Sequence, residues 1–178
     1  DWLAERDVSL IFSLRDIVES EHNRLVGIKG FRRTLRGLEF ALQAGLQKQN
    51  RIGVEIPVIH SNMERVLQDF IPAMRHLGVI PYAEQYMQVR TSSEERVMGL
   101  SFAEAREFFR RAQEIERQFG YFHKPCFGQR MLSQNKCIRP VFSVTIYPDG
   151  AVMPCPGSSK YFGSIYDSSL ERILDSDK

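Results

Sequence analysis

Three segments of the chain are rich in aliphatic and β-branched residues and have the length of single strands. They are residues 8–14 (VSLIFSL), 52–59 (IGVEIPVI) and 79–87 (VIPYAEQYM). Short apolar runs of this kind are typical of buried strands. Pro57 removes a backbone donor from the second run, which predicts a bulge or a strand end at that position.

The segments that separate these runs have the spacing of amphipathic helices. In residues 31–44 the apolar side chains recur every three or four positions, and Gly45 suits the residue just after a helix. Residues 62–77 predict a second helix with Asn62 as its N-cap. Because proline cannot donate the helical hydrogen bond, Pro72 should kink this helix or split it in two.

A third helix is predicted over residues 101–119, where Ser101 and Glu104 have the spacing of a capping box. Residues 15–30 are polar and show no period, so we expect a loop there. Strands then alternate with helices, a pattern typical of a parallel sheet with right-handed crossovers. The sequence therefore predicts an α/β domain over residues 1–120.

The pattern changes in the last third of the chain. Residues 141–153 predict a β-hairpin whose turn has the sequence Pro-Asp-Gly, in which glycine supplies the permissive backbone angles. Ser168 and Glu171 have the spacing of a second capping box, which predicts a short helix over residues 169–174. We therefore expect a small α+β domain over residues 121–178.

Composition narrows the class of protein. The chain has 178 residues, of which 43% are hydrophobic and 26% charged, and its net charge is +2. These values are ordinary for a globular protein, and no apolar run approaches the roughly 18 residues of a membrane helix. The sequence begins with Asp1 and enters a strand at once, so we expect a further N-terminal segment in the natural protein. We find no phosphate-binding glycine loop and no G-x-S-x-G nucleophile motif.

The three cysteines are the strongest chemical signal. An odd number without an export signal favours reduced thiols or metal ligation, and hence a cytoplasmic location. Their spacing is C-x10-C-x17-C, which lacks the C-x2-C pairs of a zinc ribbon. The hairpin should bring Cys137 and Cys155 to the same end, where thiolates would suit zinc or an iron–sulfur cluster. Cys126 or His123 could add a ligand; alternatively, all three cysteines are independent packing residues.

Several polar residues at predicted strand ends have both a binding and a solvated interpretation. His60 follows a strand, in the position where α/β folds place ligand loops. Ser13 ends the first strand. Glu84 and Gln85 lie in the third strand, where polar side chains must find partners or face solvent. Glu84 and Gln85 would either line a pocket or belong to an edge strand with solvated side chains.

The segment CIRPVFSVTIYPDGAVMPCPGSSKYFGSIYDSSLERIL resembles the auxiliary-cluster region of radical S-adenosylmethionine (SAM) enzymes, known as SPASM or, in its shorter form, the twitch domain. The family's opening pattern reads here Cys137-x12-Gly150-x4-Cys155. The segments VSLIFSLRD, GFRRTLRGLEFALQAGL and IPVIHSNMERVLQDFIPAMRHLGVIPYAEQY are similar to the second half of the same enzymes' partial barrel. The resemblance implies the C-terminal half of a partial (β/α) barrel with parallel strands, followed by a small iron–sulfur domain.

The resemblance also implies a radical mechanism. In that family a first cluster reduces SAM, and the resulting 5′-deoxyadenosyl radical abstracts a hydrogen atom from the substrate. The C-x3-C-x2-C motif of that first cluster is absent from this sequence, so we expect this chain alone to be inactive. The resemblance assigns SAM contacts to Ser13, Glu84 and Gln85. It assigns an auxiliary [4Fe–4S] cluster to the three cysteines, Cys126, Cys137 and Cys155.

The implied partners are a peptide or sugar substrate and a reductant such as flavodoxin or ferredoxin, without nucleic acid or membrane. Self-association through the incomplete barrel is a further expectation, since an unfinished sheet exposes an edge. Two other functions remain open. One is a non-catalytic recognition module that lost the radical cluster, and the other is a small structural zinc protein.

Overall fold

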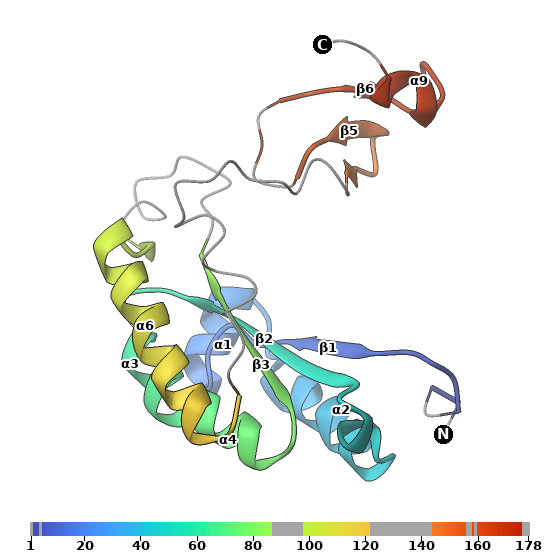
Figure 1. The fold of residues 1–178 in the computed structure, drawn as a ribbon. Helices are drawn as coiled ribbons and strands as arrows, with labels where there is room; N and C mark the ends of the chain where they lie inside the picture. The colour runs from blue at the N-terminus through green and yellow to red at the C-terminus, as the bar shows by residue number, and fades with distance from the viewer. Residues whose placement is uncertain are drawn as a thin grey trace.

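The described residues form two separate three-stranded sheets (Figure 1). The computed structural model describes residues 2–3, 5–86, 98–121, 144–155, 158 and 160–175. The first sheet is parallel, has the order β1-β2-β3, and consists of β1 (Leu10–Ser13), β2 (Ile52–Val58) and β3 (Ile80–Gln85). The predicted parallel pairing of these three strands is therefore confirmed.

Helical segments connect and follow these strands. They are α1 (Glu19–Val26), α2 (Phe31–Gln43), η1 (Leu46–Gln49), α3 (Met63–Arg65), η2 (Val66–Phe70), α4 (Ile71–His76) and α6 (Phe102–Gln118). The capping box of α6 is present as predicted: the Ser101 N–H donates to Glu104 Oε2 over 2.8 Å, and the Glu104 N–H donates to Ser101 Oγ over 3.3 Å. No described helix is long and apolar enough to cross a membrane.

The hydrophobic core lies on one face of the parallel sheet. The even-numbered side chains of β2 are all fully buried, namely Ile52, Val54, Ile56 and Val58. They belong to one cluster with residues of the helices, among them Leu38, Met74 and Phe108. Burial of each such side chain contributes about 1.5–3 kcal/mol, so this face dominates the stability of the α/β unit. On the opposite face, Ile11 of β1 is 61% exposed.

Pro57 neither ends β2 nor forms a bulge, contrary to the prediction. The pairing of β2 with β3 continues through Pro57 to Val58. In a parallel ladder, alternate residues direct their backbone groups to opposite neighbours. Pro57 therefore faces the side of β1, as Glu55 does, and β1 has ended where the Leu14 N–H donates to the Glu55 carbonyl. Because the pairing of β1 with β2 ends at Ser13 and Glu55, Pro57 lies beyond the paired residues on this side and its missing N–H costs little.

Residues 15–30 contain a helix, so the predicted loop is wrong. Helix α1 buries one side chain, His22, and has no apolar stripe that sequence periodicity could reveal. Its end is fixed by Gly27 at φ +78° and by Asn23, whose side-chain oxygen accepts from the N–H groups of Gly30 and Phe31. Tertiary contacts of a few polar residues thus form a helix that its hydrophobic pattern does not predict.

The helix predicted over residues 62–77 is continuous from Met63 to His76 but not regular. A π-helical turn, Val66–Phe70, comes just before Pro72, so the chain accommodates the proline without splitting the helix. Asn62 precedes the first helical residue, but its side chain makes no capping hydrogen bond. Asn62 therefore occupies the predicted N-cap position without a side-chain cap.

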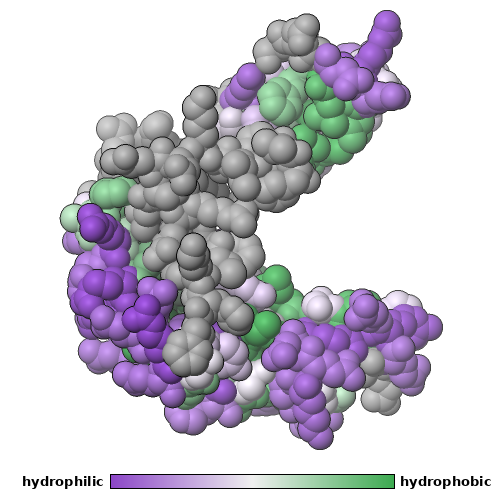
Figure 2. Space-filling model, in the orientation of Figure 1, coloured by the Kyte–Doolittle hydropathy of each residue, from purple (hydrophilic) through white to green (hydrophobic). Residues whose placement is uncertain are grey.

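The C-terminal unit has an antiparallel sheet in which β5 is central. Its elements are β4 (Thr145–Ile146), β5 (Ala151–Met153), β6 (Gly163–Ser164) and helix α9 (Leu170–Leu174). The hairpin and the short helix are confirmed, but the N-cap is Ser169, whose side chain accepts from the Arg172 N–H, rather than Ser168. In Figure 2 hydrophobic residues gather on one side of this unit. The division at residue 120 stays a prediction, because residues 122–143 lie outside the described residues.

Candidate functional site

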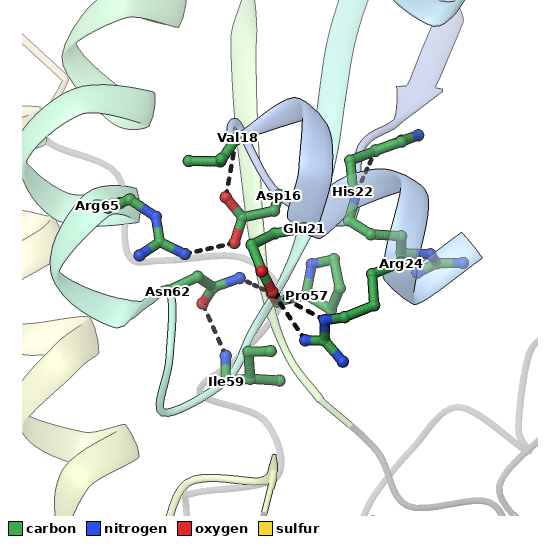
Figure 3. Close-up of polar contacts among 10 residues, drawn as sticks. Asp16, Val18, Glu21, His22, Arg24, Pro57, Ile59, Asn62 and Arg65 are labelled. Carbon is green, nitrogen blue, oxygen red and sulfur yellow. Dashed lines mark hydrogen bonds and ion pairs between the residues drawn. The ribbon is translucent and has the colours of Figure 1, made fainter. Parts of the chain in front are cut away.

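Buried polar side chains surround the ends of β1 and β2. Asp16, His22 and Asn62 are each no more than 2% exposed, and they come from the two loops and helix α1 (Figure 3). Sequence reasoning missed this group. The only available signal was the position of Asp16 and Asn62 within a few residues of strand ends, where parallel sheets place binding loops.

Asp16 joins the loop after β1 to the crossover after β2. One carboxylate oxygen accepts from the Val18 N–H over 2.9 Å, and the other accepts from Arg65 Nη2 over 2.7 Å. The hydrogen bond to Asp16 raises the pKa of Arg65. Because the carboxylate is 1% exposed and has both partners, this ion pair fixes the two loops relative to each other.

His22 is buried as a neutral imidazole. Its Nδ1 accepts from the Arg15 N–H over 3.1 Å, so the ring proton lies on Nε2, and the ring packs edge-on against Phe31. Burial lowers the pKa of His22, the positive charge of Arg15 lowers it further, and the negative charge of Asp16 partly opposes both. His22 therefore holds the backbone of Arg15 in place rather than supplying a proton at neutral pH.

Asn62 shapes the loop that carries His60. Its side-chain oxygen accepts from the Ile59 N–H, and its amide donates to the Pro57 carbonyl, both over 2.9 Å. His60 itself lies on the surface, where its Nδ1 is 3.4 Å from Glu104 Oε1. The structure thus places His60 beside the start of α6.

The residues predicted to contact SAM divide between the two faces of the sheet. Ser13 ends β1 and is exposed, and Glu84 of β3 lies on the same face of the sheet as Ser13, opposite the core. Gln85 points to the face that carries the helices, where its Oε1 is buried without a hydrogen-bond partner among the described residues. The geometry therefore groups Ser13 with Glu84 and separates both from Gln85.

Of the predicted cluster ligands, the structure describes Cys155. This thiol is half-buried and in no disulfide, and it lies two residues beyond the end of β5. Cys126, Cys137 and His123 lie outside the described residues, so the predicted meeting of Cys137 with Cys155 stays a prediction. Within the described ranges, no three His, Cys, Asp or Glu side chains are placed to hold a metal ion.

The hairpin turn explains why glycine stands five residues before Cys155. Gly150 has φ +81°, and a Cβ atom there would lie 2.5 Å from the Tyr166 ring. The Gly150 N–H closes the turn by donating to the Tyr147 carbonyl over 2.9 Å. Because only glycine fits this turn, the Gly-x4-Cys spacing fixes how far beyond the turn the thiol lies.

Comparison with known proteins gives one match. Residues 137–178 match the SPASM family, described as an iron–sulfur cluster-binding domain. No curated protein and no solved structure matches the chain. The matched residues begin at Cys137 and include Gly150, Cys155 and the whole described C-terminal sheet. This match assigns iron–sulfur cluster binding to the C-terminal segment of the chain.

Proposed function

We propose that this chain is part of a radical SAM enzyme. The C-terminal unit would hold an auxiliary iron–sulfur cluster, and the α/β unit would form half of the barrel that encloses SAM and the substrate. The observation that carries this proposal is the SPASM match over residues 137–178, because this domain is typical of radical SAM enzymes.

The donor chemistry of the C-terminal unit fits an iron–sulfur cluster. Cys155 is a free, half-buried thiol, and thiolates are the usual ligands of such clusters. We propose Cys137 as the second ligand and Cys126 as the third. A fourth ligand would come from His123, from the substrate or from another part of the natural protein.

The α/β unit supports the second half of the proposal. Its strands are parallel and its core lies on one face, as expected for the wall of a barrel. The other face carries Ser13 and Glu84, which would contact SAM. When bound, SAM and a reduced cluster supply the radical that removes a hydrogen atom from the substrate. This chain's residues would bind and orient SAM and a peptide or sugar substrate, and exclude water from them.

Two other functions make different predictions. A non-catalytic recognition module would retain the auxiliary cluster but would not bind SAM. A structural zinc protein would bind one zinc ion through the same cysteines and remain colourless. Flavodoxin or ferredoxin as reductant belongs to the enzyme proposal alone.

The test is anaerobic reconstitution with iron and sulfide, followed by metal analysis and a visible spectrum. We expect brown protein with about four iron and four sulfide ions per chain. The Cys137→Ala/Cys155→Ala variant should lose both the colour and the iron, while Ser158→Ala, close to Cys155, should retain them. The Cys126→Ala variant tests whether Cys126 is a third ligand, because the bound iron should then fall in this variant as well. Stoichiometric zinc in place of iron, or no bound metal, would refute the proposal.

A further inference from the structure

The odd-numbered side chains of β1 and β2, together with the even-numbered side chains of β3 that are opposite them, form a second face of the sheet, opposite the core. Ile11 is 61% exposed and Ser13 is exposed, whereas their even-numbered neighbours pack against the helices. None of the described core residues comes from this face. Packing of the described core therefore does not explain which residues occupy this second face.

Three polar side chains form a row across this face. In the parallel register, Ser13 of β1 is opposite Glu55 of β2, and Glu55 is opposite Tyr82 of β3. Residues that are directly opposite in a sheet have their side chains on the same face. The row thus places a hydroxyl, a carboxylate and a phenol on neighbouring strands, with the carboxylate in the centre.

The ring of Tyr82 lies across the central strand beside Glu55. A Cβ atom on Gly53 would come within 2.3 Å of Tyr82 Cε2, so the ring occupies the space that any larger residue at this position would need. Gly53 is buried although it belongs to the face opposite the core. Tyr82 and Gly53 therefore form a flat aromatic surface, here called the floor, next to the Glu55 carboxylate.

Glu55 has no partner for its charge among the described residues. It is half-buried, and it makes no side-chain hydrogen bond or ion pair there. The three strands contain no lysine or arginine. A carboxylate that no described residue pairs with can still accept a charged hydrogen bond from a bound cation.

We propose that Glu55 and the floor of Tyr82 and Gly53 bind a primary ammonium group of the substrate. A carboxylate beside an aromatic face attracts a cation both by charge and by the negative potential of the ring. The substrate would then be an amine, such as a lysine-containing peptide. That the ammonium group would lie next to SAM rests on the proposed function, in which Ser13 contacts SAM. Recognition of the ammonium group by Glu55 does not depend on it.

The probe is Nα-acetyl-lysine methyl ester, compared with the uncharged Nα-acetyl-norleucine methyl ester, and binding to the full chain is measured by saturation-transfer NMR titration. We expect the lysine probe to bind at least about tenfold more tightly, as one charge-assisted hydrogen bond provides. Glu55→Gln should abolish this preference. Glu39→Gln, which removes an exposed carboxylate from α2, should leave it unchanged.

Thermal unfolding excludes a purely structural explanation. Because Glu55 has no described partner to lose, the Glu55→Gln variant should unfold at the same temperature as the parent chain or at a higher one. Tyr82→Phe should keep the floor and the preference, whereas Tyr82→Ala should weaken it. A lower unfolding temperature in Glu55→Gln, or equal binding of both probes to the parent chain, would overturn the inference.

The two proposals fail independently. Binding of the lysine probe should persist in Cys155→Ala, which lacks the cluster ligand. A chain that binds the probe but never holds iron would refute the proposed function only. A chain that holds the cluster without preferring the lysine probe would refute the ammonium site only.

Discussion

Asp16, His22 and Asn62 show how single buried polar residues organise the loops after β1 and β2. Each is nearly inaccessible to solvent and has hydrogen-bond partners in the backbone or in Arg65. Removing one partner of a buried pair leaves the other without compensation, which costs more than loss of a surface pair. These residues therefore stabilise the loop positions as well as the fold.

The first prediction concerns Asp16→Asn. The amide keeps the shape and can still accept from the Val18 N–H, but it loses the charge that pairs with Arg65. We expect the free energy of unfolding to fall by about 1–3 kcal/mol, toward the lower end because Arg65 is partly exposed. Urea titration provides the measurement. Glu21→Gln, which breaks the exposed pair with Arg24, should cost less than about 0.5 kcal/mol, and an equal cost would contradict this account.

The second prediction is a dependence of stability on pH through His22. Its pKa is lowered in the folded protein from the ordinary 6.5, so the unfolded chain binds the extra proton more readily. The stabilisation is fully present above pH 6.5 and is lost as pH falls toward the lowered pKa. In His22→Gln the loss of stability between pH 7 and pH 5 should be smaller, as measured by urea unfolding. His76→Gln, at the exposed end of α4, should retain the parent slope.

At the scale of elements, the sequence predicted those helices and strands whose signals are local. The capping box of α6 and the apolar runs of the three parallel strands lie within a few residues of the elements that they define. The sequence could not predict α1, because that helix depends on contacts of His22 and Asn23 with other segments. The row that contains Glu55 was missed for a similar reason, since register joins residues that are distant in sequence.

The third prediction tests the cap of α6. In Ser101→Ala the Glu104 N–H loses its acceptor, so the free energy of unfolding should fall by about 0.5–2 kcal/mol. Thermal unfolding followed by circular dichroism measures the change. Ser61→Ala is the matched control, because Ser61 is exposed and does not cap a helix. If both variants unfold at the same temperature as the parent chain, the capping box does not stabilise α6.

At the scale of the whole molecule, the two units differ in how much core they bury. The α/β unit has a large apolar cluster, whereas Val152 and Ile173 are the buried aliphatic residues described in the C-terminal unit. Small domains with few buried residues usually need a disulfide, a metal or a partner for stability. The C-terminal unit therefore fits a domain whose folding is coupled to its cluster.

The fourth prediction follows from this difference. Removal of iron with a chelator should reduce the hydrogen-exchange protection of β5 to that of an unfolded chain, while β2 should remain protected. The reason is that metal binding contributes folding free energy to the unit that holds the ligands. Mass spectrometry of deuterated peptides measures both strands in one sample. Unchanged protection of β5 without iron would show that this unit folds by itself.

Pro57 also has a consequence for how the sheet assembles. A slip of β1 by two residues toward the end of β2 would preserve the alternation of its side chains, so hydrophobic burial alone would not prevent it. That slip would align a carbonyl of β1 with the nitrogen of Pro57, which has no hydrogen to donate. The proline thus makes this misaligned pairing incomplete, which favours the observed alignment, in which Ser13 is opposite Glu55.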